Sequence, residues 1–305
     1  MFEILGKTNI DFMGKRKFAF VFSGIVALIG IVAVVQISRG EAHLGIDFAG
    51  GTAVQLKFDK PIRIDEARKA LEGHGLTNAE LQEFEHENKI LIRMKASTTI
   101  EEKIAERVVA VFSKEFPDNR FVVESSTEIG PMIGKKLQED ALIAVAISFA
   151  GIILYIAARF EFRFGVAAAL ATFHDVLAVL GGFFVFDKEI TLLVVTALLT
   201  LAGYSLTDTV VVFDRIRENL RVRRRDPMET VINNGINQVL SRTIVTSLTV
   251  VLVLIPLTLW GGEVLHDFSL ALLCGVIFGT YSSIFVASPL LLLWPGGPGR
   301  LLRRG

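Results

Sequence analysis

Six stretches of 18 or more residues with almost no charge dominate this sequence. A helix needs about 20 apolar residues to cross the roughly 30 Å hydrocarbon core of a bilayer, so each stretch is long enough to span a membrane. The mean hydropathy of +0.52 and the hydrophobic fraction of 51% agree with this interpretation. We therefore predict an all-α bundle of six membrane helices, with spans at 18–38, 141–158, 164–186, 190–213, 243–262 and 268–294.

Lys and Arg are concentrated on one side of these spans. The segments 1–17, 159–163, 214–242 and 295–305 hold sixteen of them, whereas the short loops 187–189 and 261–267 hold only Lys188. Because basic loops favour the cytoplasmic side, we predict a multi-pass protein with both termini in the cytoplasm. The same rule accounts for the six arginines between Asp214 and Asp226, so no nucleic-acid partner is expected.

A soluble α+β domain is inserted between the first two spans. Its patterns predict a strand at Thr52–Phe58, a helix from Ile64 to the Gly73–Gly75 stop, strands at Ala79–Phe84 and Ile90–Met94, a helix from Thr98 to Phe116, and a strand at Arg120–Glu124. This β-α-β-β-α-β order predicts a ferredoxin-like external domain. The predicted organisation is a cytoplasmic N-terminus with the first span at 1–38, the external domain at 39–127, five further spans at 128–294 and a cytoplasmic tail at 295–305.

Asp175 lies in the middle of the apolar run from Phe164 to Phe186. A charge near the bilayer centre costs roughly 2.5–3.5 kcal/mol, so intramembrane acids are usually functional and face protein. Small residues recur on the same helical face, which lets a neighbouring helix approach closely; they are Ala168, Ala171, Ala178 and Gly182. The alternative is that Asp175 only holds two helices together by a hydrogen bond.

A second acid, Asp208, occurs near the end of the next span, and Arg242 begins the one after it. Both should lie in the same half of the membrane, so a carboxylate that alternates between a proton and an arginine partner is possible. The alternative is that Arg242 is an ordinary basic anchor that extends to the headgroups. Spacing adds further polar residues to one predicted seam between the helices: His174, Gly203, Tyr204, Thr207, Thr246 and Thr249.

The remaining motifs indicate less about function. Gly275, Gly279 and Ser283 form a stripe of small residues on the last span, which predicts helix packing. The sequence contains no Walker loop, HExxH or GxSxG motif, so we expect no enzyme activity, no cofactor and no metal site.

Four stretches together resemble one family. They are Gly45–Thr52, His174–Asp175, Gly203–Asn219 and Ser241–Ser247, and they occur in the order and topology of the SecD/SecF family of bacterial protein-export proteins, within the resistance-nodulation-division (RND) superfamily. The chain resembles the smaller subunit type, without a SecD-like half. Thr207 departs from the pattern, in which Asn is common.

The resemblance implies an RND-type bundle in the bacterial inner membrane. It implies a subunit that uses the proton motive force with SecD to assist late export and release of preproteins from SecYEG, with YajC as a further candidate partner. Asp208 and Arg242 would couple protons, Asp175 would be a structural or relay member, and Gly45, Asp47, Gly50 and Gly51 would form a hinge to the external domain. The competing interpretations are a proton-coupled RND-type small-molecule exporter and a membrane scaffold without transport activity.

Overall fold

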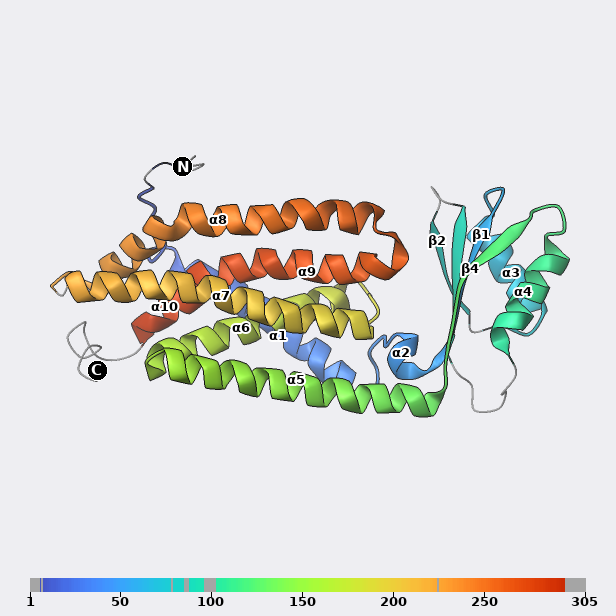
Figure 1. Cartoon of the computed structure of the whole chain (residues 1–305), viewed down its shortest axis with the longest axis horizontal. Coiled ribbons are helices and arrows are strands. Elements are labelled where there is room, and N and C mark those ends of the chain that lie inside the picture. The colour runs from blue at the N-terminus through green and yellow to red at the C-terminus, as the bar shows by residue number, and fades with distance from the viewer. Residues whose placement is uncertain are drawn as a thin grey trace. The chain divides into compact units, whose positions relative to one another are not determined.

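The computed structural model describes residues 6, 8–77, 79–84, 88–95, 103–223 and 225–293 (Figure 1). The predicted tail at 295–305 lies outside these residues, and so does the predicted helix start at Thr98. The chain divides into two compact units, one formed by residues 1–43 and 144–305 and the other by residues 44–143.

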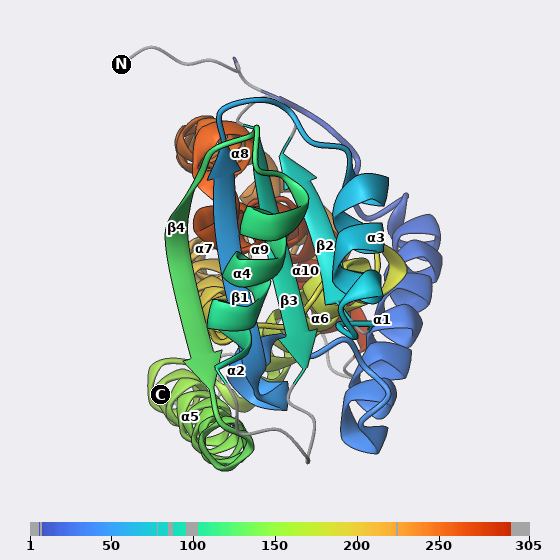
Figure 2. The same cartoon turned by 90° about the vertical axis from the view of Figure 1, so that its right-hand side faces the viewer.

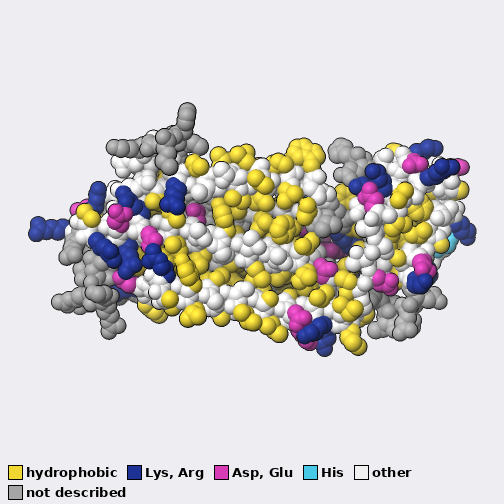
Figure 3. Space-filling view, viewed as in Figure 1, with side chains coloured by type: hydrophobic (Ala, Val, Ile, Leu, Met, Phe, Trp, Pro, Cys, Tyr) yellow, Lys and Arg dark blue, Asp and Glu magenta, His cyan; other side chains and the backbone are white. Residues whose placement is uncertain are grey.

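Long helices form the first unit. They are α1 (Arg16–Arg39), α5 (Pro131–Arg159, which begins in the other unit), α6 (Phe162–Val185), α7 (Leu192–Val222), α8 (Met228–Trp260) and α9 (Gly262–Ser282). Among the described residues, six helical segments are long and apolar enough to cross a membrane, which confirms the predicted number of spans. Apolar side chains cover the middle of this unit, and Lys and Arg gather around the α7–α8 connection (Figure 3).

The helices extend beyond the apolar runs. The sequence placed residues 214–242 outside the spans, yet α7 continues to Val222 and α8 begins at Met228. Charged residues such as Arg and Glu are good helix formers, so the helix continues after its apolar stretch ends. Only the segment from Arg223 to Pro227 separates the two helices.

The last span is not one regular helix. After α9 come a π-helix η1 (Ser283–Ala287), a short α10 (Ser288–Leu290) and a 3-10 turn η2 (Leu291–Leu293). The wider turn leaves the carbonyl of Ser283 available to the hydroxyl of Ser288, five residues later, at 2.8 Å. π-Helical turns often occur at functional sites, and this one directly follows a serine of the site below.

Small residues let α1 and α6 pack closely. A Cβ atom added at Gly30 would lie 2.2 Å from the carbonyl oxygen of Leu177, and one at Gly181 would lie 3.0 Å from the backbone nitrogen of Gly30. On the predicted small-residue face, Ala168, Ala171 and Ala178 are buried. Gly182, also predicted for this face, is not part of the close approach, since a Cβ added there would meet nothing within 4 Å, and Gly181 lies against Gly30 instead.

The second unit is a small α+β domain. It contains α2 (Ile46–Ala49), β1 (Gly51–Phe58), α3 (Ile64–Gly73), β2 (Ala79–Phe84), β3 (Lys89–Lys95), α4 (Ile104–Glu115) and β4 (Phe121–Ile129). The strands form one sheet in the order β2-β3-β1-β4, and every neighbouring pair is antiparallel. Both α3 and α4 lie on one face of this sheet (Figure 2), where Leu56, Leu71 and Phe112 are fully buried.

Two features of this unit differ from the sequence prediction. β4 runs to Ile129, five residues past its predicted end, because it pairs with β1 as far as Gly51. The predicted loop at Gly45–Gly51 contains the single helical turn α2, whose Phe48 is buried.

Candidate functional site

Three helices of the first unit meet at a group of buried polar side chains. Glycines on α9 make this possible, since a Cβ added at Gly275 would lie 2.4 Å from Leu201 and one at Gly279 would lie 3.2 Å from Ser205. The predicted small stripe of the last span therefore packs on α7. α6 approaches both helices with alanines that are completely buried, among them Ala167 and Ala171.

Asp175 lies at the centre of this contact and has no exposed surface. The hydroxyl of Ser282 donates to its Oδ2 at 2.7 Å, and the hydroxyl of Ser205 donates to the same oxygen. Nδ1 of His174 lies 3.0 Å from Oδ1. As predicted, Asp175 faces protein, and groups from α6, α7 and α9 satisfy its carboxyl group.

His174 takes part in this network through only one of its two ring nitrogens. Its side chain is 7% exposed, and among the described residues no hydrogen bond reaches the buried Nε2. Buried polar atoms are normally paired, by protein or by water. The imidazole thus contacts Asp175 through one nitrogen, and its other nitrogen is left for a water molecule or a partner group.

Asp208 lies three residues after Ser205 on α7 and is also 7% exposed. Among the described residues, its Oδ2 is buried without a hydrogen bond, as are the hydroxyl oxygens of Thr209 on the same helix and Thr243 on α8. The Thr243 hydroxyl nevertheless lies close enough to interact with the Asp208 carboxyl group. The charges of Arg242 and Asp175 both act on this carboxyl group. No hydrogen bond or ion pair joins Asp208 to Arg242 in the described structure, where Arg242 is exposed.

The remaining predicted seam residues separate into two sets. Tyr204 is partly buried, with its hydroxyl 3.5 Å from that of Ser247. The others are exposed on neighbouring faces of α7 and α8, namely Gly203, Thr207, Thr246 and Thr249. Each of these threonine hydroxyls donates to a carbonyl of its own helix, which lowers the cost of a polar side chain facing a membrane or a protein partner.

Helical geometry explains this division. Tyr204 and Asp208 form one i, i+4 pair and Gly203 with Thr207 forms the next, and adjacent positions on a helix point about 100° apart. The first pair faces the bundle and the second faces outward. The residues predicted to form one seam therefore form two groups. His174, Asp175, Tyr204 and Asp208 make an inner cluster, and the exposed residues make an outer face that also carries Arg242.

The sequence interpretation missed two serines that bind Asp175. Ser205 and Ser282 are neutral residues within apolar runs, where serine is a common packing residue. A usable signal existed for Ser205, because it precedes Asp208 by three residues and therefore lies on the same side of α7.

The predicted hinge residues form a tight joint within the external unit. Gly50 and Gly51 have φ of 73° and 148°, where a side chain would be strained. A Cβ at Gly51 would lie 2.3 Å from the carbonyl oxygen of Met94, and one at Gly134, on α5, would lie 2.8 Å from that of Phe48. Gly45 caps α2, and Asp47 lies in its first turn.

Comparison with known proteins places these features in one family. Residues 108–296 match the family described as "Protein export membrane protein SecD/SecF, C-terminal", and residues 43–62 match the "SecD/SecF GG Motif". The chain is 50% identical to "Protein translocase subunit SecF" of Thermodesulfovibrio yellowstonii, with all of both chains covered. It is 39% identical to the subunit of the same name from Calditerrivibrio nitroreducens, with 95% of each chain covered.

Solved structures of SecDF proteins are also similar. The crystal structure of SecDF from Thermus thermophilus, a translocon-associated membrane protein, matches with a TM-score of 0.83 and 34% identity over 94% of this chain. A SecDF structure in a super-membrane-facing form matches with a TM-score of 0.68 and 35% identity over 96%. In both cases the chain spans only 39% of the SecDF chain.

Proposed function

Because the chain belongs to the SecD/SecF family and has a SecF-type accessory role in protein translocation, we propose that proton movement through Asp208 powers that role. The subunit uses the proton motive force with SecD to assist late export and release of preproteins at SecYEG. It is a transport subunit without enzyme activity, in the bacterial inner membrane with both termini cytoplasmic. YajC is a further candidate partner.

The observation that carries this proposal is the unpaired oxygen of Asp208. An ionised carboxylate buried between membrane helices is costly unless a cation or hydrogen-bond donors compensate it. Its Oδ2 has no partner in the described structure, while Arg242 on α8 interacts with it at a distance. Two arrangements remove the cost: a proton on Asp208, or movement of α8 that brings the guanidinium into contact.

Asp175 has a different role in this proposal. Its donors from α7, α9 and His174 hold it in one position, so it links the helices and can pass a proton through His174. The exposed polar face with Gly203, Thr207, Arg242, Thr246 and Thr249 suits a protein partner better than lipid, which supports assembly with SecD.

The external unit is assigned to the ferredoxin-like arrangement. Its element order and its fully antiparallel β2-β3-β1-β4 sheet support this assignment. The joint at Gly45–Gly51 anchors that domain to the start of α5, and through it domain movement is coupled to the helices.

The test is release of a secreted substrate from spheroplasts, with and without a protonophore. Asp208→Asn keeps the volume of the side chain but removes proton exchange, so the complex with SecD should form while the uncoupler-sensitive part of release is lost. Arg242→Ala and Arg242→Lys should both lose the uncoupler-sensitive part of release. The alanine variant has no cation, and the ammonium of lysine lacks the planar guanidinium that binds a carboxylate through two hydrogen bonds. Asp226→Asn and Arg225→Ala, outside the spans, are the matched controls.

If the two residues act as a unit, the double variant should be no worse than either single one. Full, uncoupler-sensitive release by Asp208→Asn would refute the coupling role. Loss of the SecD complex itself would instead support the scaffold interpretation.

A further inference from the structure

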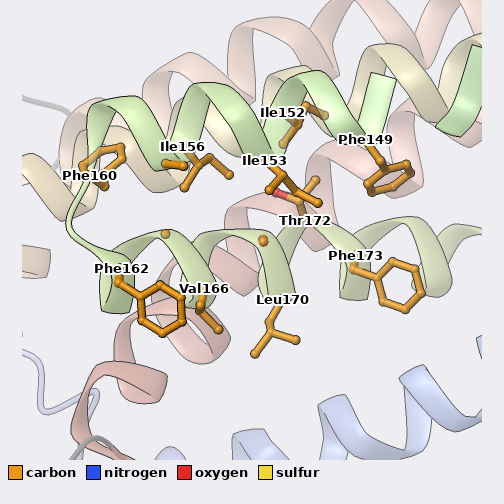
Figure 4. Close-up of a pocket in the computed structure, with 13 residues that line it drawn as sticks. Phe149, Ile152, Ile153, Ile156, Phe160, Phe162, Val166, Leu170, Thr172 and Phe173 are labelled. Carbon is orange, nitrogen blue, oxygen red and sulfur yellow. The ribbon is translucent and has the colours of Figure 1, made fainter. Parts of the chain in front are cut away.

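An apolar groove separates α5 from α6 in the first unit (Figure 4). Its volume is about 540 Å³, within the range of roughly 300–1,000 Å³ for ligand sites. The lining comes from residues 149–157 of α5, Phe160 in the turn that follows, and residues 162–173 of α6, and Thr172 contributes its only polar side chain. Phe149 and Phe173 lie at one end, and Phe160 and Phe162 lie at the other.

The length of the groove matches one leaflet of a bilayer. Each wall covers 12 residues from its first to its last lining residue, 149–160 and 162–173, a rise of roughly 16 Å at about 1.5 Å per residue. The hydrocarbon core is about 30 Å thick, so the groove covers about half of it. Leu170 and Phe173 are half exposed at its rim, so it opens to the surrounding membrane.

The size and lining of the groove suit a single hydrocarbon chain. Its volume is that of a small-ligand site, and its walls are apolar apart from Thr172.

Two arginines lie at one end of the groove. The guanidinium of Arg159 lies 5.1 Å from the ring centre of Phe160, a lining residue. Arg159 is 41% exposed while paired with Asp214 at 2.8 Å, so part of its surface remains available. Arg163 follows Phe162 on the other wall. This is where the phosphate of a lipid from the nearer leaflet would lie.

We propose that the groove binds one acyl chain of a phospholipid, with the lipid phosphate at Arg159. The acyl chain fills the space between these two helices, which are joined by a short turn. It thereby holds α5 at a fixed distance from α6. The hydroxyl of Thr172, which is buried and has no hydrogen-bond partner among the described residues, lies in this lining one turn from Asp175. The proposal does not depend on proton coupling.

The test uses the full chain in complex with its SecD partner, reconstituted in bilayers that contain phosphatidylglycerol with a photoreactive group in the middle of one acyl chain. Adducts should concentrate on the peptides 149–160 and 162–173. Ala169→Trp fills the groove and should abolish them, whereas Ala158→Trp, on an exposed face of α5 outside the groove, should not. Arg159→Gln should weaken labelling by the anionic and the zwitterionic lipid alike, because both carry the phosphate.

Two results would overturn the proposal. Equal labelling of all exposed faces of α5 in the unmodified complex would mean bulk lipid only. A disulfide between Leu170→Cys and a cysteine on a partner subunit would mean that protein covers the groove.

Discussion

The carboxyl group of Asp175 depends on two serine hydroxyls from different helices. Removing one hydrogen-bond partner of a buried polar group costs about 1–3 kcal/mol, and Ser282→Ala should lower the stability of the helical unit by that amount. Ser38→Ala is the control, because that hydroxyl bonds only its own exposed helix end. Thermal unfolding of the complex in detergent measures both, and equal melting temperatures for the two variants would contradict the role of Ser282.

Asp11 caps the turn before α1 and should titrate below its ordinary value. The backbone N–H of Gly14 and then the amide of Asn233 on α8 hold its pKa below 3.8. Because the pKa of Asp11 is lower in the folded protein than in the unfolded chain, its ionised carboxylate stabilises the folded state at any pH above 3.8. This stabilisation is lost only as the pH falls through the lower pKa of the folded protein.

NMR titration of the carboxyl groups, on the isotope-labelled protein in micelles, should give Asp11 a pKa below 3.8. The substitution Asn233→Ala should raise that pKa. A midpoint at or above the ordinary value in the unmodified chain would show that the two donors do not act on this group.

At the residue scale, charged residues within apolar runs were the feature from which the site could be predicted. Asp175 and Asp208 could be found because an acid within an apolar run has few structural explanations. Ser205 and Ser282 could not be assigned, because a neutral hydroxyl gives no indication of which neighbouring helix it meets. The separation of Arg242 from Asp208 also needed the structure, since shared depth in a membrane does not fix the rotation of either helix.

At the element scale, the contact between α1 and α6 depends on closely packed glycines, of which Gly30 has the least room for a side chain. Gly30→Ala would place a methyl group 2.2 Å from the Leu177 carbonyl oxygen, and overpacking of this kind typically costs about 1–3 kcal/mol. Gly24→Ala is the matched control on the same helix, because nothing lies within 4 Å of its added carbon. We expect reduced thermal stability and yield for the first variant only, and an equal loss for both would show that α1 does not pack as described.

Periodicity located the strands and helices of the external domain within a few residues, because alternation of buried and exposed side chains is a local property. It did not give α2, since a four-residue turn contains too little sequence for a period to be recognised. The π-helical turn was missed for a related reason: its residues after Ser283 are all apolar, so a shift of one position changes no visible pattern.

At the scale of the whole molecule, the distribution of basic residues predicts which end of the helical unit faces the cytoplasm. With Cys274→Ser as background, a membrane-impermeant thiol reagent added to intact spheroplasts should label Asp118→Cys in the external unit. Arg225→Cys, between α7 and α8, should react only after lysis. The reverse labelling pattern would invert the topology.

The π-helical turn at Ser283–Ala287 gives the last span one residue more than a regular helix of the same length would have. A deletion of one residue within the turn should therefore be tolerated as a change to regular α-helix, while Ser282 keeps its place against Asp175. Because the wider turn already absorbs the additional residue, Ser288 and Leu291 should keep facing their present neighbours after this deletion, whereas a deletion in a regular helical turn would rotate everything after it by about 100°. In an alignment of related subunits, a single-residue gap should fall within this turn, and chains that carry it should need no compensating changes downstream.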